Sequence, residues 1–274
     1  MTVLDQAAGA DARSAAAFRY LPQVFALTIC LSAFLLFGVQ PMFTKMVLPA
    51  LGGSPAVWSV AMVFFQTLLL LGYLYAHLSA RYLGPRPAVI VHAVLVAAAF
   101  LMLPLTVSQA LGAPPEEAQG FWLIGVFSAS VGLPFFVLAA TAPLLQSWFA
   151  RSGHPEAGNP YALYVASNIG SFIALLSYPL LIEPLLPLQA QTRSWMLAFA
   201  LLAAGLATCA AMTVWRALPR SAENTAEGTE EAAAARPAWP QRLRWIALAA
   251  IPSGLLVSVT AHLSTDVASA PLLW

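Results

Sequence analysis

The fold is decided by the stretch Phe37-Gly-Val-Gln-Pro-Met-Phe-Thr-Lys-Met-Val-Leu-Pro-Ala-Leu-Gly-Gly-Ser-Pro-Ala-Val-Trp58, which continues to Gly72-Tyr-Leu-Tyr-Ala-His77. Two long apolar segments meet here across a connector that contains Lys45 and several glycines and prolines. Gln40, Gln66 and His77 lie within these segments or at their ends. A polar side chain in an apolar segment of bilayer length costs free energy unless it faces a partner or a water-filled space. The stretch therefore predicts two membrane spans whose polar residues face such a partner or space.

The composition points to a membrane protein. Of the 274 residues, 60% are hydrophobic and only 8% are charged. A soluble domain carries about 25% charged residues, so most of this chain does not face water. The net charge of +1 gives no indication that the chain binds nucleic acid. Cys30 and Cys209 lie in apolar runs without metal-ligand spacing, which predicts buried free thiols.

The apolar segments have the length of membrane spans, because a helix needs about 20 apolar residues to cross the hydrocarbon core. Seven segments reach or approach this length, and the fourth is long enough to tilt or to break at Pro134 and Pro143. Only helices and closed barrels satisfy their backbone in lipid, and no segment alternates like a barrel strand. The predicted fold is therefore an all-α, polytopic transmembrane helix bundle. The expected spans are residues 21–43, 56–80, 88–106, 121–149, 161–185, 195–215 and 245–263.

The basic residues indicate the orientation. With the N-terminus in the cytoplasm, only Lys45 and Arg193 of the 12 lysines and arginines fall on the outer side. An excess of positive charge in cytoplasmic loops is the positive-inside pattern. We therefore predict a multi-pass protein with a cytoplasmic N-terminus. The inner group is Arg13, Arg19, Arg81, Arg86, Arg151, Arg216, Arg220, Arg236, Arg242 and Arg244.

Four regions follow from this pattern. Residues 1–20 are predicted to be a cytoplasmic tail, and residues 21–215 a six-helix transmembrane domain. Residues 216–244 are polar, acidic and rich in alanine, which is typical of a flexible linker. Residues 245–274 hold a seventh helix and the start of a second half, and their apolar ending predicts a truncated chain. Six spans, a linker and a seventh span are the layout of a two-halved transporter.

An internal repeat is indicated by two similar corners. The first span ends in Gln40-Pro41-Met42 and the fourth in Ala142-Pro143-Leu-Leu-Gln146. Each leads through a connector with glycine and proline into a helix that begins with an aromatic residue, Trp58 or Tyr161. With three spans in each unit, the two corners lie on opposite membrane faces. Such inverted repeats are typical of secondary transporters.

One helical stripe carries several polar residues in the fifth span. Tyr164, Ser167, Asn168 and Ser171 are three or four positions apart, and Gly170 lies beside them. One interpretation is a packing seam, in which small residues let helices approach and polar ones bond across them. The other is the polar lining of a substrate cavity. Small and polar residues most often form seams, and the sequence alone leaves both interpretations open.

Glu183 is the only acidic residue within the first six spans. It lies near the outer end of its helix, from where it can extend to the membrane interface. Alternatively, it is a carboxylate for proton or cation coupling, paired with Lys45 or Arg193 on the same side. Lys45, in the expected outer connector, is either a solvated anchor or the partner of an anionic group.

The remaining polar candidates are a His–Asp pair and two glutamines. His262 and Asp266 are one helical turn apart at the outer end of the seventh span. They form either a proton relay or ion site, or an ordinary helix end with capping residues. Gln40 and Gln66 complete the set of residues that could line a polar cavity or couple transport to an ion.

Motifs of soluble enzymes are absent from the sequence. No GxGxxG, P-loop, nucleophile elbow, HExxH or CxxC occurs. The sequence therefore predicts no catalytic residue, no cofactor and no metal site in this chain.

Three motifs carry a resemblance to a known family: Gln40-Pro41-Met42 with Lys45, Leu51-Gly-Gly-Ser-Pro-Ala-Val-Trp58, and Gly72-Tyr-Leu-Tyr-Ala-His77. They resemble the membrane portion of bacterial spermidine-synthase-like proteins, often described as fused major-facilitator/spermidine-synthase proteins. Residues 161–183 and 262–274 are similar to later motifs of that family. The resemblance implies a major-facilitator-like six-helix half, the start of a second half, and location in the bacterial inner membrane.

The same resemblance implies a partner. Members of the family typically continue into a cytoplasmic Rossmann-like domain that resembles aminopropyltransferases and would bind decarboxylated S-adenosylmethionine and a polyamine. This chain lacks that domain, so no catalytic residue can be assigned from the family. Three hypotheses follow: a non-catalytic, transporter-like domain of a spermidine-synthase-like protein, a secondary transporter of a small, polyamine-like solute, and a plain membrane anchor for an enzyme.

Overall fold

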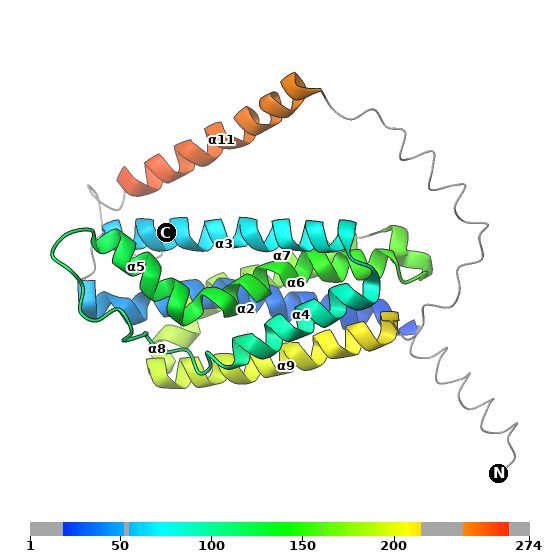
Figure 1. Cartoon of the computed structure of the whole chain (residues 1–274), viewed down its shortest axis with the longest axis horizontal. Helices are drawn as coiled ribbons and strands as arrows, with labels where there is room; N and C mark the ends of the chain where they lie inside the picture. The colour runs from blue at the N-terminus through cyan, green and yellow to red at the C-terminus, as the bar shows by residue number, and fades with distance from the viewer. Residues whose placement is uncertain (1–18, 52–54, 160, 215–237, 263–274) are drawn as a thin grey trace, which may run out of the picture. The chain divides into compact units, whose positions relative to one another are not determined.

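The computed structural model describes residues 19–51, 55–159, 161–214 and 238–262, and all the regular structure in these ranges is helical. The chain divides into two compact units, Met1–Arg216 (unit 1) and Ala217–Trp274 (unit 2). Figure 1 shows the helices of unit 1 running roughly parallel or antiparallel to one another. Its elements are α2 (Leu21–Leu51), α3 (Pro55–Tyr82), α4 (Pro85–Phe100), α5 (Gln119–Phe127), η1 (Ser128–Gly132), α6 (Leu133–Ala150), η2 (Pro155–Gly158), α7 (Tyr161–Ser177), η3 (Tyr178–Ile182), α8 (Glu183–Leu185) and α9 (Leu188–Val214).

Six helices of the described chain are long and apolar enough to cross a membrane. They confirm six of the seven predicted spans as membrane-length helices. The third predicted span, residues 88–106, is instead the shorter helix α4, which ends at Phe100. Its 16 residues extend about 24 Å, less than the roughly 30 Å of the hydrocarbon core. Pro104 has no N–H and disfavours helical backbone at Leu103, which favours an end of the helix before this residue.

The first span is longer than predicted. We expected it to end at Phe43, but α2 continues through Pro41 and Pro49 to Leu51. The position of Lys45 in a connector was therefore wrong, because this residue lies inside the helix. Met42, Phe43 and Val47 are all buried, and their packing against neighbouring helices holds the last turns in place despite the prolines.

The fourth and fifth spans are both interrupted by a π-helical segment. The fourth breaks at η1, just before Pro134, whereas Pro143 lies within the uninterrupted helix α6. The fifth breaks at η3, just before Pro184. A proline leaves the carbonyl four residues earlier without its helical partner. That carbonyl belongs to Ser130 or Leu180, and both lie inside the π-helical segment, where the backbone bonding pattern has already changed.

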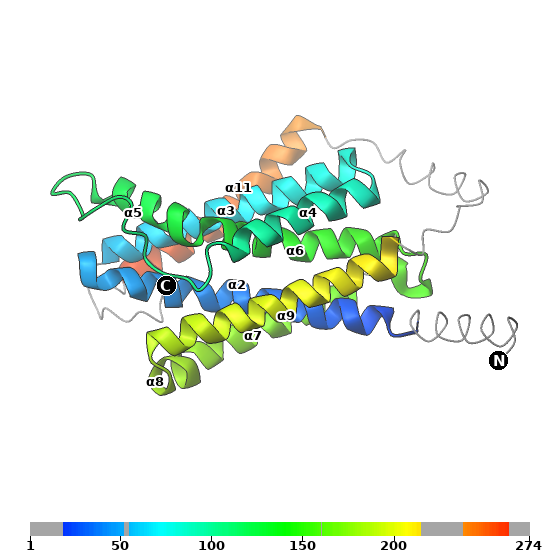
Figure 2. The ribbon, with the colours of Figure 1, turned by 60° about the horizontal axis from the view of Figure 1, so that its bottom comes forward.

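The helices pack as two groups of three. α2 contacts α7 and α9, whereas α6 contacts α3 and α4, and α2 and α6 also contact each other. Figure 2 shows α3, α4 and α6 as one layer and α2, α7 and α9 as the other. These main contacts are unchanged when the first span is exchanged with the fourth, the second with the fifth and the third with the sixth, whereas the smaller contacts of α3 with α2 and of α9 with α6 are not matched in this way. Each exchanged pair runs in opposite directions, because two spans lie between its members in the chain.

In each group, two helices pack closely at a glycine. A Cβ atom on Gly170 of α7 would lie 2.1 Å from the carbonyl oxygen of Cys30 on α2. A Cβ atom on Gly72 of α3 would lie 2.6 Å from Cβ of Ala139 on α6. The backbones can approach this closely only because these positions have no side chain. Gly170 therefore forms a packing seam, as one interpretation of the fifth span predicted.

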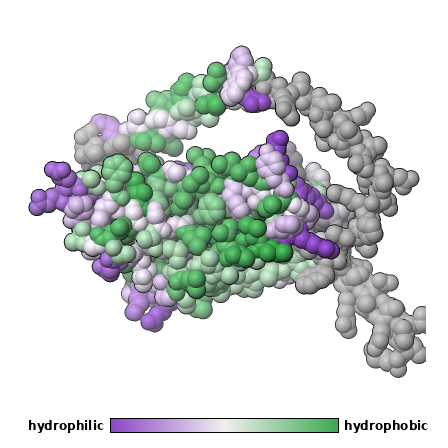
Figure 3. Space-filling view, in the orientation of Figure 1, coloured by the Kyte–Doolittle hydropathy of each residue, from purple (hydrophilic) through white to green (hydrophobic). Residues whose placement is uncertain are grey.

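The surface of unit 1 has the polarity of a membrane-embedded bundle. Figure 3 shows hydrophobic side chains over the middle of its visible face and hydrophilic ones toward its two ends. Arg81 ends α3, Arg86 begins α4 and Arg151 follows α6, so these three arginines share one end. The guanidinium of Arg151 also donates a hydrogen bond to the carbonyl of Ala80. Lys45 and Arg193 lie near the other end of unit 1, as the predicted separation of these two residues from the three arginines requires.

Unit 2 contains the helix α11 (Trp239–His262). It begins six residues before the predicted start at residue 245, so the predicted linker is too long at this end. Pro240 lies in the first turn, where its missing N–H and fixed φ are compatible with a helix. The rest of the predicted linker and the tail up to residue 18 lie outside the described residues.

Candidate functional site

The structure brings two of the predicted site residues together in an ion pair. Lys45 of α2 donates from Nζ to Oε1 of Glu183, the first residue of α8. The two residues are 138 positions apart in the chain. Their side chains are 37% and 39% exposed, so the pair is neither buried nor fully surrounded by water. Of the two partners proposed for Glu183, the structure selects Lys45.

The π-helical segment η3 helps to place Glu183 beside α2. Successive residues of an α-helix are about 100° apart around its axis, so one additional residue in a turn rotates the following side chains by about that angle. Without η3, the side chain of Glu183 would extend from a different face of the helix. Lys45 reaches it because α2 extends beyond Phe43 and carries the lysine on a helical surface rather than in a loop.

The ion pair lies near one end of unit 1. Figures 1 and 2 both place α8, the C-terminal end of α2 and the loop between α4 and α5 at the same end. An exposed pair of this kind contributes only about 0–1 kcal/mol to stability, because water and salt screen both charges. Another cation can therefore replace the lysine ammonium at little cost in folding free energy.

The two glutamines do not meet each other. Gln40 of α2 is half-buried, and its Nε2 donates to the carbonyl oxygen of Leu36 in its own helix at 3.2 Å. Gln66 of α3 is exposed on the surface of the described unit. Gln40 lies five residues before Lys45 on α2, about one and a half helical turns away, whereas Gln66 lies on another helix.

The polar stripe of the fifth span is divided between two faces of α7. Gly170 is buried against α2, whereas Tyr164 and Asn168 are exposed within the described part of unit 1. The hydroxyl of Ser171 donates to the carbonyl oxygen of Asn168 at 2.9 Å, a local bond within the helix. Tyr164 and Asn168 therefore do not form the seam, and their predicted role in a cavity stays a prediction.

The His–Asp pair of the seventh span stays a prediction as well. His262 is exposed at the last residue of α11. Asp266 lies outside the described residues. In the parts of the chain that the structure describes, no group of three or more His, Cys, Asp or Glu side chains has an arrangement that could hold a metal ion.

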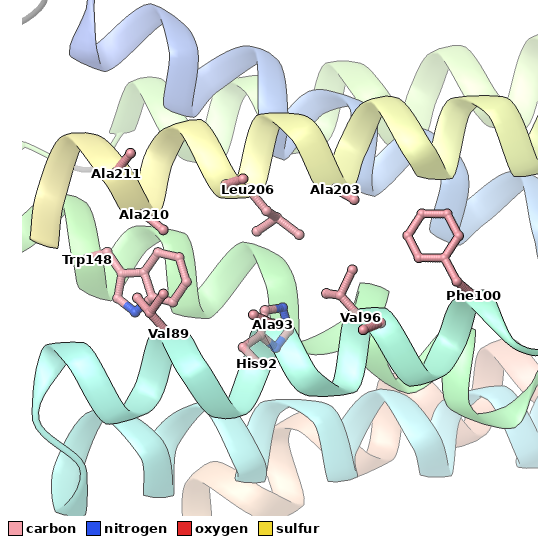
Figure 4. Close-up of a pocket in the computed structure, with 12 residues that line it drawn as sticks. Val89, His92, Ala93, Val96, Phe100, Trp148, Ala203, Leu206, Ala210 and Ala211 are labelled. Carbon is pink, nitrogen blue, oxygen red and sulfur yellow. The ribbon is translucent and has the colours of Figure 1, made fainter.

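The sequence reasoning missed a cavity of about 480 Å³ between α4, α6 and α9. We call it the α4–α9 groove, and Figure 4 shows its lining. It was missed because its walls consist of alanine and other apolar residues, which look like ordinary span residues. The signal that could have indicated it is the run of alanines on two helices. The lining residues are Val89, His92, Ala93, Val96, Ala97, Phe100, Trp148, Ala203, Leu206, Ala207, Ala210 and Ala211.

His92 is the titratable residue of this groove and is only 2% exposed. Its Nε2 lies 3.5 Å from Oγ1 of Thr141 on α6, at the limit of a hydrogen bond. The imidazole also stacks on the ring of Tyr75 and meets the edge of Trp148, with centroids 6.1 Å and 6.4 Å away.

The chain was compared with models of protein families, with curated proteins and with solved structures, and no match was found in any of the three. The fold and site therefore have to be interpreted from their own geometry. Six apolar helices of membrane length make this chain a multi-pass membrane protein with an all-α bundle.

Proposed function

We propose that this chain is a transporter-like membrane domain of a spermidine-synthase-like protein, which recognises a small cationic solute and does not catalyse a reaction itself. In this proposal the chain lies in a bacterial inner membrane with its N-terminus in the cytoplasm. A Rossmann-like enzyme domain, fused or separate, is its partner. The motifs between Gln40 and His77 support the family, and the arginine-rich end of unit 1 supports the orientation.

The observation that carries the proposal is the exchange-symmetric packing of the two groups of three helices. An anchor for an enzyme needs a single span and has no need of two inverted units around a common contact. Inverted repeats allow one unit to move against the other, and interrupted helices near the substrate site are a further feature of secondary transporters. The interruptions of the fourth and fifth spans and the matched main contacts of the two groups support this proposal.

The ion pair explains why the solute would be cationic. Glu183 is held near the end of unit 1 by an exposed lysine rather than by a buried network. An ammonium group of a solute can take the place of Nζ of Lys45 on the carboxylate. Released Lys45 would then extend into water, and the exchange of one cation for another leaves the local charge unchanged. Gln40 lies about one and a half turns before Lys45 on α2 and is a second polar side chain in this part of the helix.

Uptake of a radiolabelled diamine or triamine into proteoliposomes tests this proposal. We expect saturable uptake of putrescine or spermidine by the parent chain, and a several-fold loss in Gln40→Leu and Asn168→Leu if these side chains contact the solute. The matched control is Thr67→Leu, because this exposed residue of α3 bonds only to its own helix. Absence of uptake by the parent would refute transport by this chain, and full activity of both variants would remove Gln40 and Asn168 from the site.

The orientation is tested with single cysteines. In a background with Cys30→Ala and Cys209→Ala, we expect Glu117→Cys to react with a membrane-impermeant maleimide added to intact cells. We expect Glu156→Cys to react only after the membrane is permeabilised. Both positions are exposed and lie in loops at opposite ends of unit 1. The reverse labelling pattern would contradict the cytoplasmic N-terminus.

A further inference from the structure

The α4–α9 groove opens along the outer surface of unit 1. Its floor contains buried side chains, among them Val96 of α4 and Leu206 of α9. Its rims are low, because the exposed lining residues Ala93 and Ala97 on α4 and Ala207 on α9 are alanines. The outer surface of a membrane-spanning bundle faces hydrocarbon, so a lipid chain can enter the groove from the side.

The polar atoms beside the groove are not accessible from it. Nδ1 of His92 is buried, and so is the hydroxyl of Tyr75, whose ring stacks on the imidazole with the centroids 6.1 Å apart. Neither atom has a hydrogen-bond partner among the described residues, but a molecule in the groove cannot reach either of them. None of the lining residues is Asp, Glu, Lys or Arg. The groove itself therefore accepts an apolar chain, and a polar group of the ligand has to be recognised beyond its ends.

The length of the groove matches one leaflet of a bilayer. Its lining on α4 extends from Val89 to Phe100, which are eleven residues or about 16 Å apart along the helix. The hydrocarbon core is about 30 Å thick, so one leaflet contributes about 15 Å. Figure 4 shows Val89 and Trp148 at one end of the groove and Phe100 at the other. An acyl chain of a lipid crosses one leaflet, so it fits the groove in length and in polarity.

The end of the groove at Val89 and Trp148 lies at the arginine-rich end of unit 1. Arg86 is three residues before Val89, one turn away on the same side of α4, and its side chain is exposed. Arg151 follows Trp148 by three residues and adds a second positive charge. Glu156, exposed in the loop after α6, offsets only one of these charges. A guanidinium group in this position suits a phosphate at the level of the lipid headgroups.

We propose that the α4–α9 groove binds one acyl chain of an anionic phospholipid whose phosphate lies against Arg86. The second acyl chain remains in the surrounding bilayer, because the groove has a volume of about 480 Å³ and the width of a single chain. Basic side chains at the ends of grooves between membrane helices are suited to lipid headgroups. A soluble, polar metabolite would have no partner for its polar groups along the apolar lining. This inference does not depend on the proposed transport of a cation.

The first test compares two lipids that have the same acyl chains and differ in headgroup charge. Phosphatidylglycerol and phosphatidylcholine are each titrated into the purified full chain in detergent, and bound lipid is measured by native mass spectrometry. We expect phosphatidylglycerol to bind about fivefold more tightly, because its headgroup carries a net negative charge. Free glycerol phosphate in large excess should not displace it, since it has no acyl chain. Equal affinities for the two lipids, or displacement by glycerol phosphate, would overturn the proposal whether or not any variant folds.

Variants locate the lipid at the groove. Arg86→Gln should abolish the preference for phosphatidylglycerol, whereas Arg193→Gln, which removes an exposed arginine at the other end of unit 1, should keep it. Ala97→Phe should weaken the binding of both lipids several-fold, because the added ring would occupy the groove. Val94→Phe is the matched control, since Val94 is exposed on α4 and is not a lining residue.

Thermal unfolding of each variant shows whether the fold is kept. In folded variants, unchanged lipid binding by Ala97→Phe would place the acyl chain outside the groove and refute the proposal. A preference for phosphatidylglycerol that survives in Arg86→Gln would refute the assignment of the headgroup to this arginine.

Discussion

Gly170→Ala is expected to destabilise unit 1 by about 3 kcal/mol, at the upper end of the usual cost of overpacking. The added Cβ would lie 2.1 Å from the carbonyl oxygen of Cys30 and 2.9 Å from its carbonyl carbon. These are backbone atoms of a helix interior, so no flexible side chain can move away. α7 must instead move away from α2 at this contact.

Thermal unfolding in detergent, followed by circular dichroism, measures this effect. A loss of about 3 kcal/mol lowers the midpoint by roughly 6–12 °C in a chain of this size. Gly38→Ala is the matched control, because Gly38 lies inside α2 and a Cβ there would have nothing within 4 Å. We expect this control to be neutral or to stabilise by about 0.5–1 kcal/mol, since alanine favours the helix. Equal midpoints for both variants would refute the close α2–α7 contact.

The second large effect is expected at the ion pair between Lys45 and Glu183. Substitutions of these two residues should change solute uptake in opposite directions. Under the proposed function, Glu183→Gln should lower the uptake of putrescine at least tenfold, because the amide no longer attracts an ammonium group. Lys45→Met removes the competing cation from the same carboxylate. It should lower the apparent KM by up to about fivefold, the equivalent of the roughly 1 kcal/mol that an exposed pair contributes.

Glu117→Gln is the control for the loss of one carboxylate, because Glu117 is exposed in the loop at the same end of unit 1. Its uptake should equal that of the parent. The decisive result is that the two variants have opposite effects: Glu183→Gln weakens uptake, whereas Lys45→Met lowers the apparent KM. If Glu183→Gln and Lys45→Met lose uptake equally and both lower the unfolding midpoint, the pair joins α2 to α8 structurally and does not bind the solute.

The membrane spans were predictable because they depend on local composition. Around 20 apolar residues in a row have to be buried in lipid or protein wherever they lie in the fold. The helix ends were predicted less well, since they depend on neighbours. Lys45 was expected in a connector, but burial of Phe43 and Val47 extends α2 past it. Likewise, α4 was expected to reach residue 106 and ends at Phe100.

The candidate site was predicted in part. Glu183 was identified because an acid in an apolar span is unusual, and Lys45 was named as one of two partners for it. The choice of Lys45 could not be made from the sequence, because it depends on the rotation introduced by η3 and on the packing of α7 against α2. The α4–α9 groove was not predicted, since an alanine has the same appearance in a sequence whether it lines a packed contact or a cavity.

The sequence by itself determined that this protein is a multi-span, all-α membrane protein, and it predicted the shared end of Arg81, Arg86 and Arg151 in unit 1. Hydrophobic length and charge are properties of each segment alone, so no knowledge of its neighbours was needed. Only the tertiary structure decided which charges pair, that neighbouring helices pack closely at Gly170 and Gly72, and that His92 is buried beside the α4–α9 groove. These features arise between segments that are distant in the chain, and a shift of one residue in the helical register changes them.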